Sequence, residues 1–355
     1  MFKGDPSDGE NGGGDRARVL YDGDAMEEQS DEYTLEDEVG QGPLGAIFRG
    51  RAPGGAGYER IVAIKHLRAE AGSDDAFVQT LATQAGTLMG RPRPNVEGIV
   101  DVVQFGPECY LVVDWIEGPS LKAWANAYHG QSKPAPVGQL LAIAQQILFA
   151  LHSLHERGLL HGGLNTSAIR LDRLGHPLLT RIGVRTALDA SLAENRWATD
   201  AGLRLVPPEG GLSVAGDVFG MGLTLYTILA GAGELKDLPD DLRARLLAGK
   251  PVDLDPIRQD IPAVVLRTIE RALARDPAER FETAASMARS MDFILRSLPE
   301  MTDSAALSHS IAEILPETGA KTRTPAKPPR APGLRTENTD QLDLADLRAL
   351  RIDQE

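Results

Sequence analysis

A glycine-rich turn and a lysine further along the chain have the types and spacing to hold a phosphate group. The glycines are Gly40, Gly42 and Gly45, and Lys65 ends the run Val-Ala-Ile-Lys. Three such glycines can also open a dinucleotide-binding helix, but that motif needs a helix directly after its third glycine. Residues 46–49, Ala-Ile-Phe-Arg, are typical of a strand. We therefore expect the glycines at the tip of a hairpin and Lys65 on a third strand.

The other residues placed for chemistry lie within 159–183. A long helix is predicted before them, because the apolar residues of 137–157 recur at helical spacing. A loop beginning at His161 follows, then a short apolar strand over 169–171, a turn, and a second strand that runs into Arg181-Ile182-Gly183. The helix, loop and hairpin are the elements that must position any side chain acting here.

The chain resembles the protein kinase family, because it has a glycine-rich hairpin, then the Val-Ala-Ile-Lys strand, then the loop-hairpin segment in the family's order. The resemblance is closest to bacterial Ser/Thr kinase-like domains. The resemblance implies an α+β, bilobal fold over 33–299, with a β-rich N-lobe over 33–117 and a helical C-lobe over 118–299. In the family, the loop reads H-R-D-L-x-x-x-N and the end of the second strand reads D-F-G.

The residues that carry catalysis in this family are replaced here. Gly163 stands at the catalytic Asp position, Ala168 at the metal-binding Asn and Arg181 at the metal-binding Asp. Phosphoryl transfer depends on metal ions held by the last two and on the loop Asp that orients the hydroxyl. Arg181 would put a permanent cation where a divalent metal should sit. The resemblance therefore implies a pseudokinase, with no metal site and no cofactor required.

The resemblance also implies a nucleotide slot and a structural set. The slot would be lined by Gly40, Gly42, Gly45, Ile47, Ala63, Lys65, Val113, Asp114, Ile116, Leu171 and Arg181. The structural set comprises His161, Asp217, Glu209 and Arg280. Asp217 would accept hydrogen bonds from the backbone of the catalytic loop, and Glu209 would pair with Arg280. We expect Leu88, Ile182 and His161 to stack across the lobes.

The helix predicted over 77–89 resembles the family's helix C, whose Glu pairs with the lysine. Gln84 stands at that position, and no carboxylate lies between Asp75 and Glu97. We therefore expect Lys65 to lose its ion pair, leaving two positive charges with Arg181. One hypothesis is that the cleft binds ATP or another phosphate ligand without metal. The other, which Pro43 in the glycine turn favours by removing a backbone N–H, is an empty or self-plugged cleft.

Composition narrows the classes of function. The net charge of −14 disfavours nucleic-acid binding, which needs clustered Lys and Arg. The single cysteine, Cys109, excludes an internal disulfide, fits a reducing cytoplasm and is expected to be a buried thiol. No run of ~18 apolar residues is apparent, so no membrane span is predicted. The N-terminus also lacks the apolar core of a signal peptide.

The tails have a different composition. Residues 1–32 form an acidic arm poor in large apolar groups, and the linker 300–338 is rich in Pro, Thr and basic residues; both are expected to be disordered. Residues 339–355 are typical of a short amphipathic helix, either a frayed end or a docking segment. Thr186, Ser191 and Thr199 are candidate phosphorylation sites in the segment after Gly183.

These observations favour a catalytically inactive signalling scaffold or allosteric partner, for example of an active kinase or another signalling protein. The alternative is an atypical ATP-using transferase, of a protein kinase or nucleotidyl-transfer type, with a rearranged site. It would need a metal site built from acids elsewhere in the chain. A third option is a sensor that binds a nucleotide.

Overall fold

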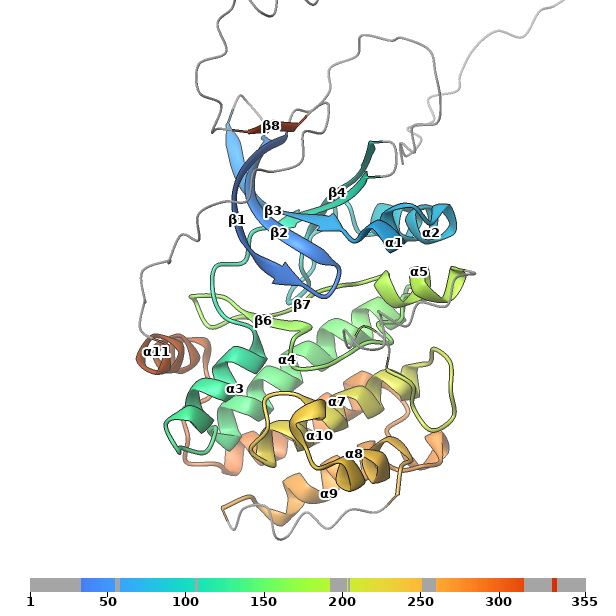
Figure 1. Cartoon of the computed structure of the whole chain (residues 1–355). Coiled ribbons are helices and arrows are strands. Elements are labelled where there is room, and N and C mark those ends of the chain that lie inside the picture. Colours follow the sequence, from blue (N-terminus) through green and yellow to red (C-terminus); the bar gives the residue numbers. More distant parts are fainter. Residues whose placement is uncertain are drawn as a thin grey trace, which may run out of the picture.

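The computed structural model describes residues 33–54, 58–105, 108–191, 203, 205–250, 260–315 and 334–336 (Figure 1). The acidic arm 1–32 and the candidate helix 339–355 lie outside the described residues, as does Thr199. Two lobes are visible, a β-sheet with a short helical layer and a larger bundle of helices. The predicted bilobal α+β fold is confirmed.

The N-lobe sheet contains β1 (Tyr33–Gly42), β2 (Gly45–Pro53), β3 (Glu59–Leu67), β4 (Ile99–Phe105) and β5 (Glu108–Asp114). These five strands pair antiparallel in the order β4-β5-β3-β2-β1. Strand β8 (Leu334–Thr336) extends the sheet by pairing parallel with β1. The glycines therefore lie at the β1–β2 turn and Lys65 on β3, as predicted.

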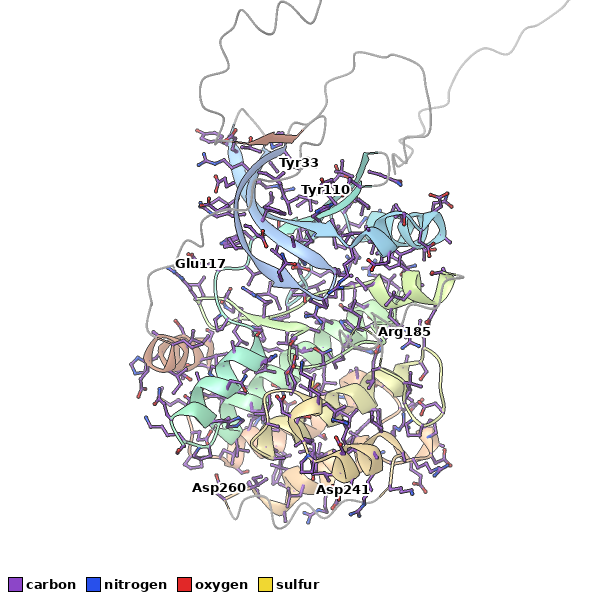
Figure 2. The ribbon with its side chains drawn as sticks, viewed as in Figure 1. Tyr33, Tyr110, Glu117, Arg185, Asp241 and Asp260 are labelled. Atoms are coloured by element: carbon purple, nitrogen blue, oxygen red, sulfur yellow. The ribbon has the colours of Figure 1, made fainter. Side chains whose placement is uncertain are left out.

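Alternation along the strands gives the sheet two apolar faces, because successive side chains of a strand point to opposite sides. On β5, Tyr110 and Val112 belong to a small outer cluster that also includes Tyr33, and Tyr110 and Tyr33 are labelled in Figure 2. Leu111 and Val113 belong to the main core. That core joins the sheet to helix α2 and to the C-lobe.

Helices α1 (Ala69–Gly72) and α2 (Asp75–Gly86) follow β3. Asp74 caps α2, accepting a hydrogen bond from the backbone N–H of Phe77 at 3.0 Å. Apolar residues of α2 at helical spacing, Phe77, Val78, Leu81 and Ala85, are buried against the sheet. This amphipathic pattern is the physical reason why the segment forms a helix on one face of the N-lobe.

The C-lobe is built around two buried helices, α4 (Val137–His155) and α7 (Val214–Leu229). Every residue of α7 from 216 to 229 is buried, as expected of a helix that is apolar on all sides. The remaining elements surround this pair: α3 (Leu121–Gly130), β6 (Ile169–Leu171), β7 (Pro177–Leu179), α5 (Val184–Ala190), η2 (Leu235–Asp237), α8 (Asp240–Leu247), α9 (Ala263–Ala272), η3 (Pro277–Glu279), α10 (Ala284–Ser297) and α11 (Ser304–Ile314).

Helix α4 is long and apolar enough to cross a membrane by composition alone, which the sequence reading did not anticipate. However, 67% of its most apolar window is buried inside the protein. A core helix packed against α7 and α10 is buried in this way. The length and composition of α4 are therefore weak evidence that it spans a membrane. No second helix in the described part of the chain meets the same criterion.

Part of the segment expected to be a disordered linker is ordered. Helix α11 covers 304–314 and packs on α3, where the Trp124 indole N–H donates to the Ser310 hydroxyl at 3.2 Å. Its buried residues Leu307, Ile311 and Ile314 recur at helical spacing. The expectation for 300–338 is therefore wrong over α11 and over strand β8, while 316–333 and 337–338 lie outside the described residues.

Candidate functional site

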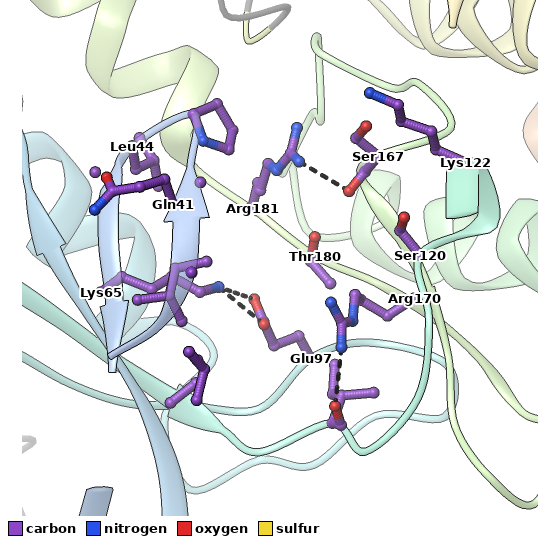
Figure 3. A pocket seen from close by; sticks show the side chains of 18 of the residues that line it. Gln41, Leu44, Lys65, Glu97, Ser120, Lys122, Ser167, Arg170, Thr180 and Arg181 are labelled. Atoms are coloured by element: carbon purple, nitrogen blue, oxygen red, sulfur yellow. Dashed lines mark hydrogen bonds and ion pairs between the residues drawn. The ribbon is translucent and has the colours of Figure 1, made fainter. Parts of the chain in front are cut away.

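A cavity of about 650 Å³ lies between the lobes, under the β1–β2 turn (Figure 3). Strands β1, β2 and β3 supply its roof, and the segment 114–122 its outer side. The β6–β7 hairpin and residues 234–236 supply its floor and mouth. The cavity therefore collects residues from the glycine-rich turn, the strand of Lys65 and the hairpin that ends at Arg181.

Lys65 is paired, contrary to the prediction. Its ammonium lies 2.9 and 3.0 Å from the two carboxylate oxygens of Glu97, which is nearly buried. Glu97 lies just before β4, and its backbone N–H donates to Leu179 at the end of β7 at 2.9 Å. The prediction failed because it sought the partner on helix α2, whereas the fold brings another segment to Lys65.

Gln84 lies on α2, as predicted, but packs against Gly183, the N-cap residue of helix α5. A Cβ added at Gly183 would lie 2.5 Å from the Cβ of Gln84. Helix α5 begins directly after Gly183 and packs on α2. The two candidate phosphorylation sites that the structure describes are in or beside this helix, Thr186 within it and Ser191 after it, bonded to Asp74.

Arg181 occupies the position of the metal-binding Asp and lines the cavity. Its backbone is left-handed, with φ of 67°, a conformation that non-glycine residues seldom adopt. Its Nη2 donates to the Ser167 carbonyl at 2.8 Å, while Nη1 is buried with no hydrogen-bond partner. Burial lowers the pKa of Arg181 to about 10, although Glu97 and Glu234 oppose that shift. The guanidinium therefore remains a cation at neutral pH.

The catalytic loop leaves no room for a carboxylate at its usual position. A Cβ added at Gly163 would lie 2.4 Å from the carbonyl oxygen of Leu203. Ala168 is fully buried, and its backbone N–H donates to Asn165 at 3.0 Å. Across the described residues, no cluster of three His, Cys, Asp or Glu side chains could hold a metal ion.

The structural residues meet as predicted. Asp217 accepts hydrogen bonds from the backbone N–H groups of His161 at 2.9 Å and Gly162 at 2.7 Å. Its burial would raise its pKa, but hydrogen bonds led by that of His155 outweigh this and lower the pKa. His155, which the sequence analysis did not select, bonds Asp217 at 2.8 Å. The His161 ring bonds the Thr180 carbonyl at 2.9 Å and so links loop to hairpin.

The predicted pair of Glu209 and Arg280 is also present. The Arg280 Nη1 and Nη2 atoms lie 2.8 and 2.7 Å from the two carboxylate oxygens of Glu209, a bidentate arrangement. The Arg280 side chain is fully buried and lies over the ring of Phe219. Leu88 and Ile182 are buried in one core cluster, consistent with packing across the lobes.

The base-binding part of the slot differs from the prediction at two positions, Val113 and Leu171, which are buried and do not line the cavity. Ile47, Ala63, Asp114 and Ile116 line the cavity as expected, and so do Gly40, Gly42 and Gly45. Val113 pairs with Ala63 across strands and is fully buried. Leu171 is also fully buried, and it is the preceding residue, Arg170, that lines the cavity.

Arg170 is tied to the segment that links the lobes. Its Nη2 donates to the carbonyls of Ile116 at 3.1 Å and Gly118 at 2.5 Å, as the dashed line in Figure 3 shows for one of them. Burial lowers the pKa of Arg170, and the nearby carboxylate of Glu97 opposes that shift. The slot therefore has a guanidinium where the resemblance implied a leucine.

Glu234 is a further site residue that sequence reasoning missed. Its Oε2 lies 2.9 Å from the ammonium groups of both Lys122 and Lys236, and its Oε1 accepts from Ser167 at 3.0 Å. Burial would raise the pKa of Glu234, but these hydrogen bonds lower it to about 2. It lies after α7, where a lone acid in sequence gives no signal of its own.

Comparison with known proteins agrees with this architecture. The family model for protein tyrosine and serine/threonine kinases matches residues 33–289. The chain belongs to this family, which is the class that its two lobes, catalytic-loop anchor and Glu209–Arg280 pair define. Among solved structures, the PknI kinase domain of Mycobacterium tuberculosis is 23% identical, with a TM-score of 0.59 over 76% of this chain and 99% of that one.

Curated relatives are bacterial serine/threonine kinases. PrkC of Bacillus subtilis is 26% identical over 239 residues, which are 64% of this chain and 36% of the relative. PkaA of Streptomyces coelicolor is 28% identical over 324 residues, 84% of this chain and 57% of the relative. The chain thus spans well under two thirds of the length of these relatives.

Proposed function

We propose that this member of the kinase family is a pseudokinase that does not transfer phosphate. The observation that carries the proposal is the buried guanidinium of Arg181 at the metal-binding position, fixed to the Ser167 carbonyl at 2.8 Å. A cation there repels a divalent metal, and metal ions supply most of the charge neutralisation in phosphoryl transfer. The lack of room at Gly163 supports the same conclusion.

The retained structural residues support a role as a binding partner in signalling. Asp217 and Arg280 hold the catalytic loop and the C-lobe in a defined arrangement, although the residues for chemistry are replaced. A fixed shape without chemistry serves recognition, and an active kinase or another signalling protein is the class of partner that we propose. The segment 339–355 is the candidate docking peptide, to be tested by pull-down with and without it.

A labelling assay tests the loss of catalysis. The purified chain is incubated with labelled ATP, Mg²⁺ or Mn²⁺ and a generic protein substrate. We expect labelling no greater than that of Lys65→Met, with an active kinase as positive control. Labelling that is robust, disappears in Lys65→Met and persists after removal of 339–355 would overturn the proposal. It would favour the alternative, an ATP-using transferase with a rearranged site.

A further inference from the structure

The walls of the cavity carry more positive than negative charge, although the whole chain has a net charge of −14. Basic side chains in the lining are Lys65, Arg68, Lys122, Arg170, Arg181 and Lys236. Acidic side chains are Glu97, Asp114 and Glu234. Six cations against three anions leave an excess of three positive charges in one concave site. Such a cleft concentrates anions, because low-dielectric walls focus the field.

The lysine that holds phosphate in this family is already neutralised. Both carboxylate oxygens of Glu97 are within 3.0 Å of the Lys65 ammonium, and Glu97 is nearly buried. A phosphate group approaching Lys65 would also approach the Glu97 carboxylate. The attraction of this corner for an anion is therefore small, and the excess positive charge lies elsewhere in the cavity.

Arg181 has the free hydrogen-bonding capacity that Lys65 lacks. Its Nη2 is bonded to Ser167, while Nη1 is buried without a hydrogen-bond partner. Figure 3 shows the side chain between the glycine-rich turn and Ser167, facing the mouth that Lys122 borders. A guanidinium presents a fork of N–H groups that matches phosphate geometry. Lys122 and Lys236 add positive charge at the same mouth, shared with Glu234.

Arg170 changes how a base would be recognised. A planar guanidinium can stack on any nucleobase, since every base has a π-face, so it does not distinguish one base from another. Arg170 also donates to the Ile116 and Gly118 carbonyls, so these acceptors are already engaged. The slot therefore offers weaker discrimination for adenine than an apolar floor with free carbonyls.

We infer that the cleft binds a polyphosphate anion directly, without a divalent cation, through Arg181 with Lys122 and Lys236, and that it recognises the phosphates rather than the base. The inference deepens the proposed function. It rests on that proposal in one respect only, namely that no metal ion binds at Arg181. Inorganic tripolyphosphate and nucleoside triphosphates share this chemistry, so the comparison between them decides whether a base contributes.

Calorimetric titration of the full chain in the presence of a chelator tests the inference, with tripolyphosphate, ATP and GTP as ligands. We expect the three dissociation constants to agree within about threefold, because charge dominates binding. Arg181→Gln should weaken all three by roughly tenfold or more, since a charge-assisted hydrogen bond to the phosphates is lost. Lys236→Gln, at an exposed position, should weaken all three several-fold and is a second variant that leaves the core intact.

Two further variants separate this site from the family's usual one. Lys65→Met combined with Glu97→Gln removes one positive and one negative charge, so the net charge of the cavity is unchanged and affinity for tripolyphosphate should stay within about threefold of that of the unmodified chain. Arg267→Gln, which removes an exposed arginine on α9, is the matched charge control and should change nothing. Thermal unfolding of each variant checks that it is folded.

Several results would overturn the inference. These are tight binding of ATP with none of tripolyphosphate, binding that requires Mg²⁺, loss of binding in the Lys65 and Glu97 double variant, or no binding of any ligand at millimolar concentration. Each is independent of the labelling assay. A chain that labels a substrate yet binds tripolyphosphate in chelator would refute the proposed function and leave the anion site standing.

Discussion

Lys65 on β3 and Glu97, just before β4, form a nearly buried ion pair with Nζ–Oε distances of 2.9 and 3.0 Å. The resemblance assigns the carboxylate to helix α2, but here that helix carries Gln84, packed against Gly183. Because Glu97 is also bonded through its backbone to Leu179 at the end of β7, the pair does not depend on the position of α2. The positive charge of Lys65 is therefore compensated by Glu97 whether or not α2 moves.

Glu97→Gln should lower the free energy of unfolding by about 3–5 kcal/mol, because it leaves the Lys65 ammonium buried without a counter-charge. Urea denaturation gives the difference directly. Gln84→Ala is the control on α2, and we expect a change within about 1 kcal/mol, since the substitution removes no charge and keeps the Cβ that packs against Gly183. Equal effects of the two substitutions would show that Glu97 does not carry the pair.

The lobes and the structural anchors could be predicted from the sequence, by two different routes. Apolar periodicity predicted α4, and the resemblance to the kinase family implied the roles of Asp217 and of the Glu209–Arg280 pair. The partner of Lys65 could not be predicted in the same way. It depends on how closely the segment before β4 approaches β3 in the folded chain, and no spacing rule in the sequence encodes that distance.

The sequence does contain a signal that Arg170, and not Leu171, lines the cavity. In the strand 169–171, Ile169 and Leu171 share one face, because side chains alternate, and both are fully buried. Arg170 must then point the other way, into the cavity. A shift of one residue moves every side chain of a strand to the opposite face, and the sequence reading placed the cavity on the wrong one.

Gly163→Ala should destabilise the fold by about 1–3 kcal/mol, the usual cost of an overpacked site. The added Cβ would lie 2.4 Å from the Leu203 carbonyl oxygen, so the backbone must move. Gly130→Ala, at the end of α3 with no atom within 4 Å of an added Cβ, is the control and should be neutral or slightly stabilising. If both variants unfold at the same urea concentration as the unmodified chain, the space at Gly163 is larger than described.

Ser310→Ala tests whether α11 belongs to the folded domain. The substitution leaves the buried Trp124 indole N–H without its acceptor and removes the 2.7 Å contact with the Tyr128 hydroxyl. We expect a loss of about 1–3 kcal/mol in denaturant titration. Ser308→Ala, which removes an exposed bond to the Arg173 carbonyl, should cost less than about 1 kcal/mol. Similar small values for both would mean that α11 does not hold its place on α3.

Cys109 should resist thiol reagents in the folded protein. Burial raises the pKa of its thiol to about 12, and the side chain is fully buried. Only the thiolate reacts, and at pH 8 almost none is present. Labelling with a chromogenic disulfide should therefore be negligible in buffer and reach one equivalent in denaturant. Rapid labelling of the folded chain at pH 8 would show that β5 opens or that the thiol is exposed.

Glu234 should stabilise the folded protein at neutral pH, and this contribution should be lost as the solution becomes acidic. Its pKa is lowered from 4.5 to about 2 in the folded protein, because the bonds from Lys122, Lys236 and Ser167 outweigh the effect of burial. The folded state thus releases the proton more readily than the unfolded state does. The stabilisation is complete above the ordinary pKa and is lost as the pH falls from about 4.5 towards 2.

The measurement compares the unmodified chain with Glu234→Gln, because other carboxyl groups titrate in the same range and cancel in the difference. The difference in unfolding free energy should be constant between pH 8 and 6 and shrink steadily from about pH 5 to pH 3. Glu156→Gln, at an exposed site on the C-terminal end of α4, should give a difference that stays near zero. A Glu234 difference that does not change with pH would mean that its carboxylate is not held by the two lysines.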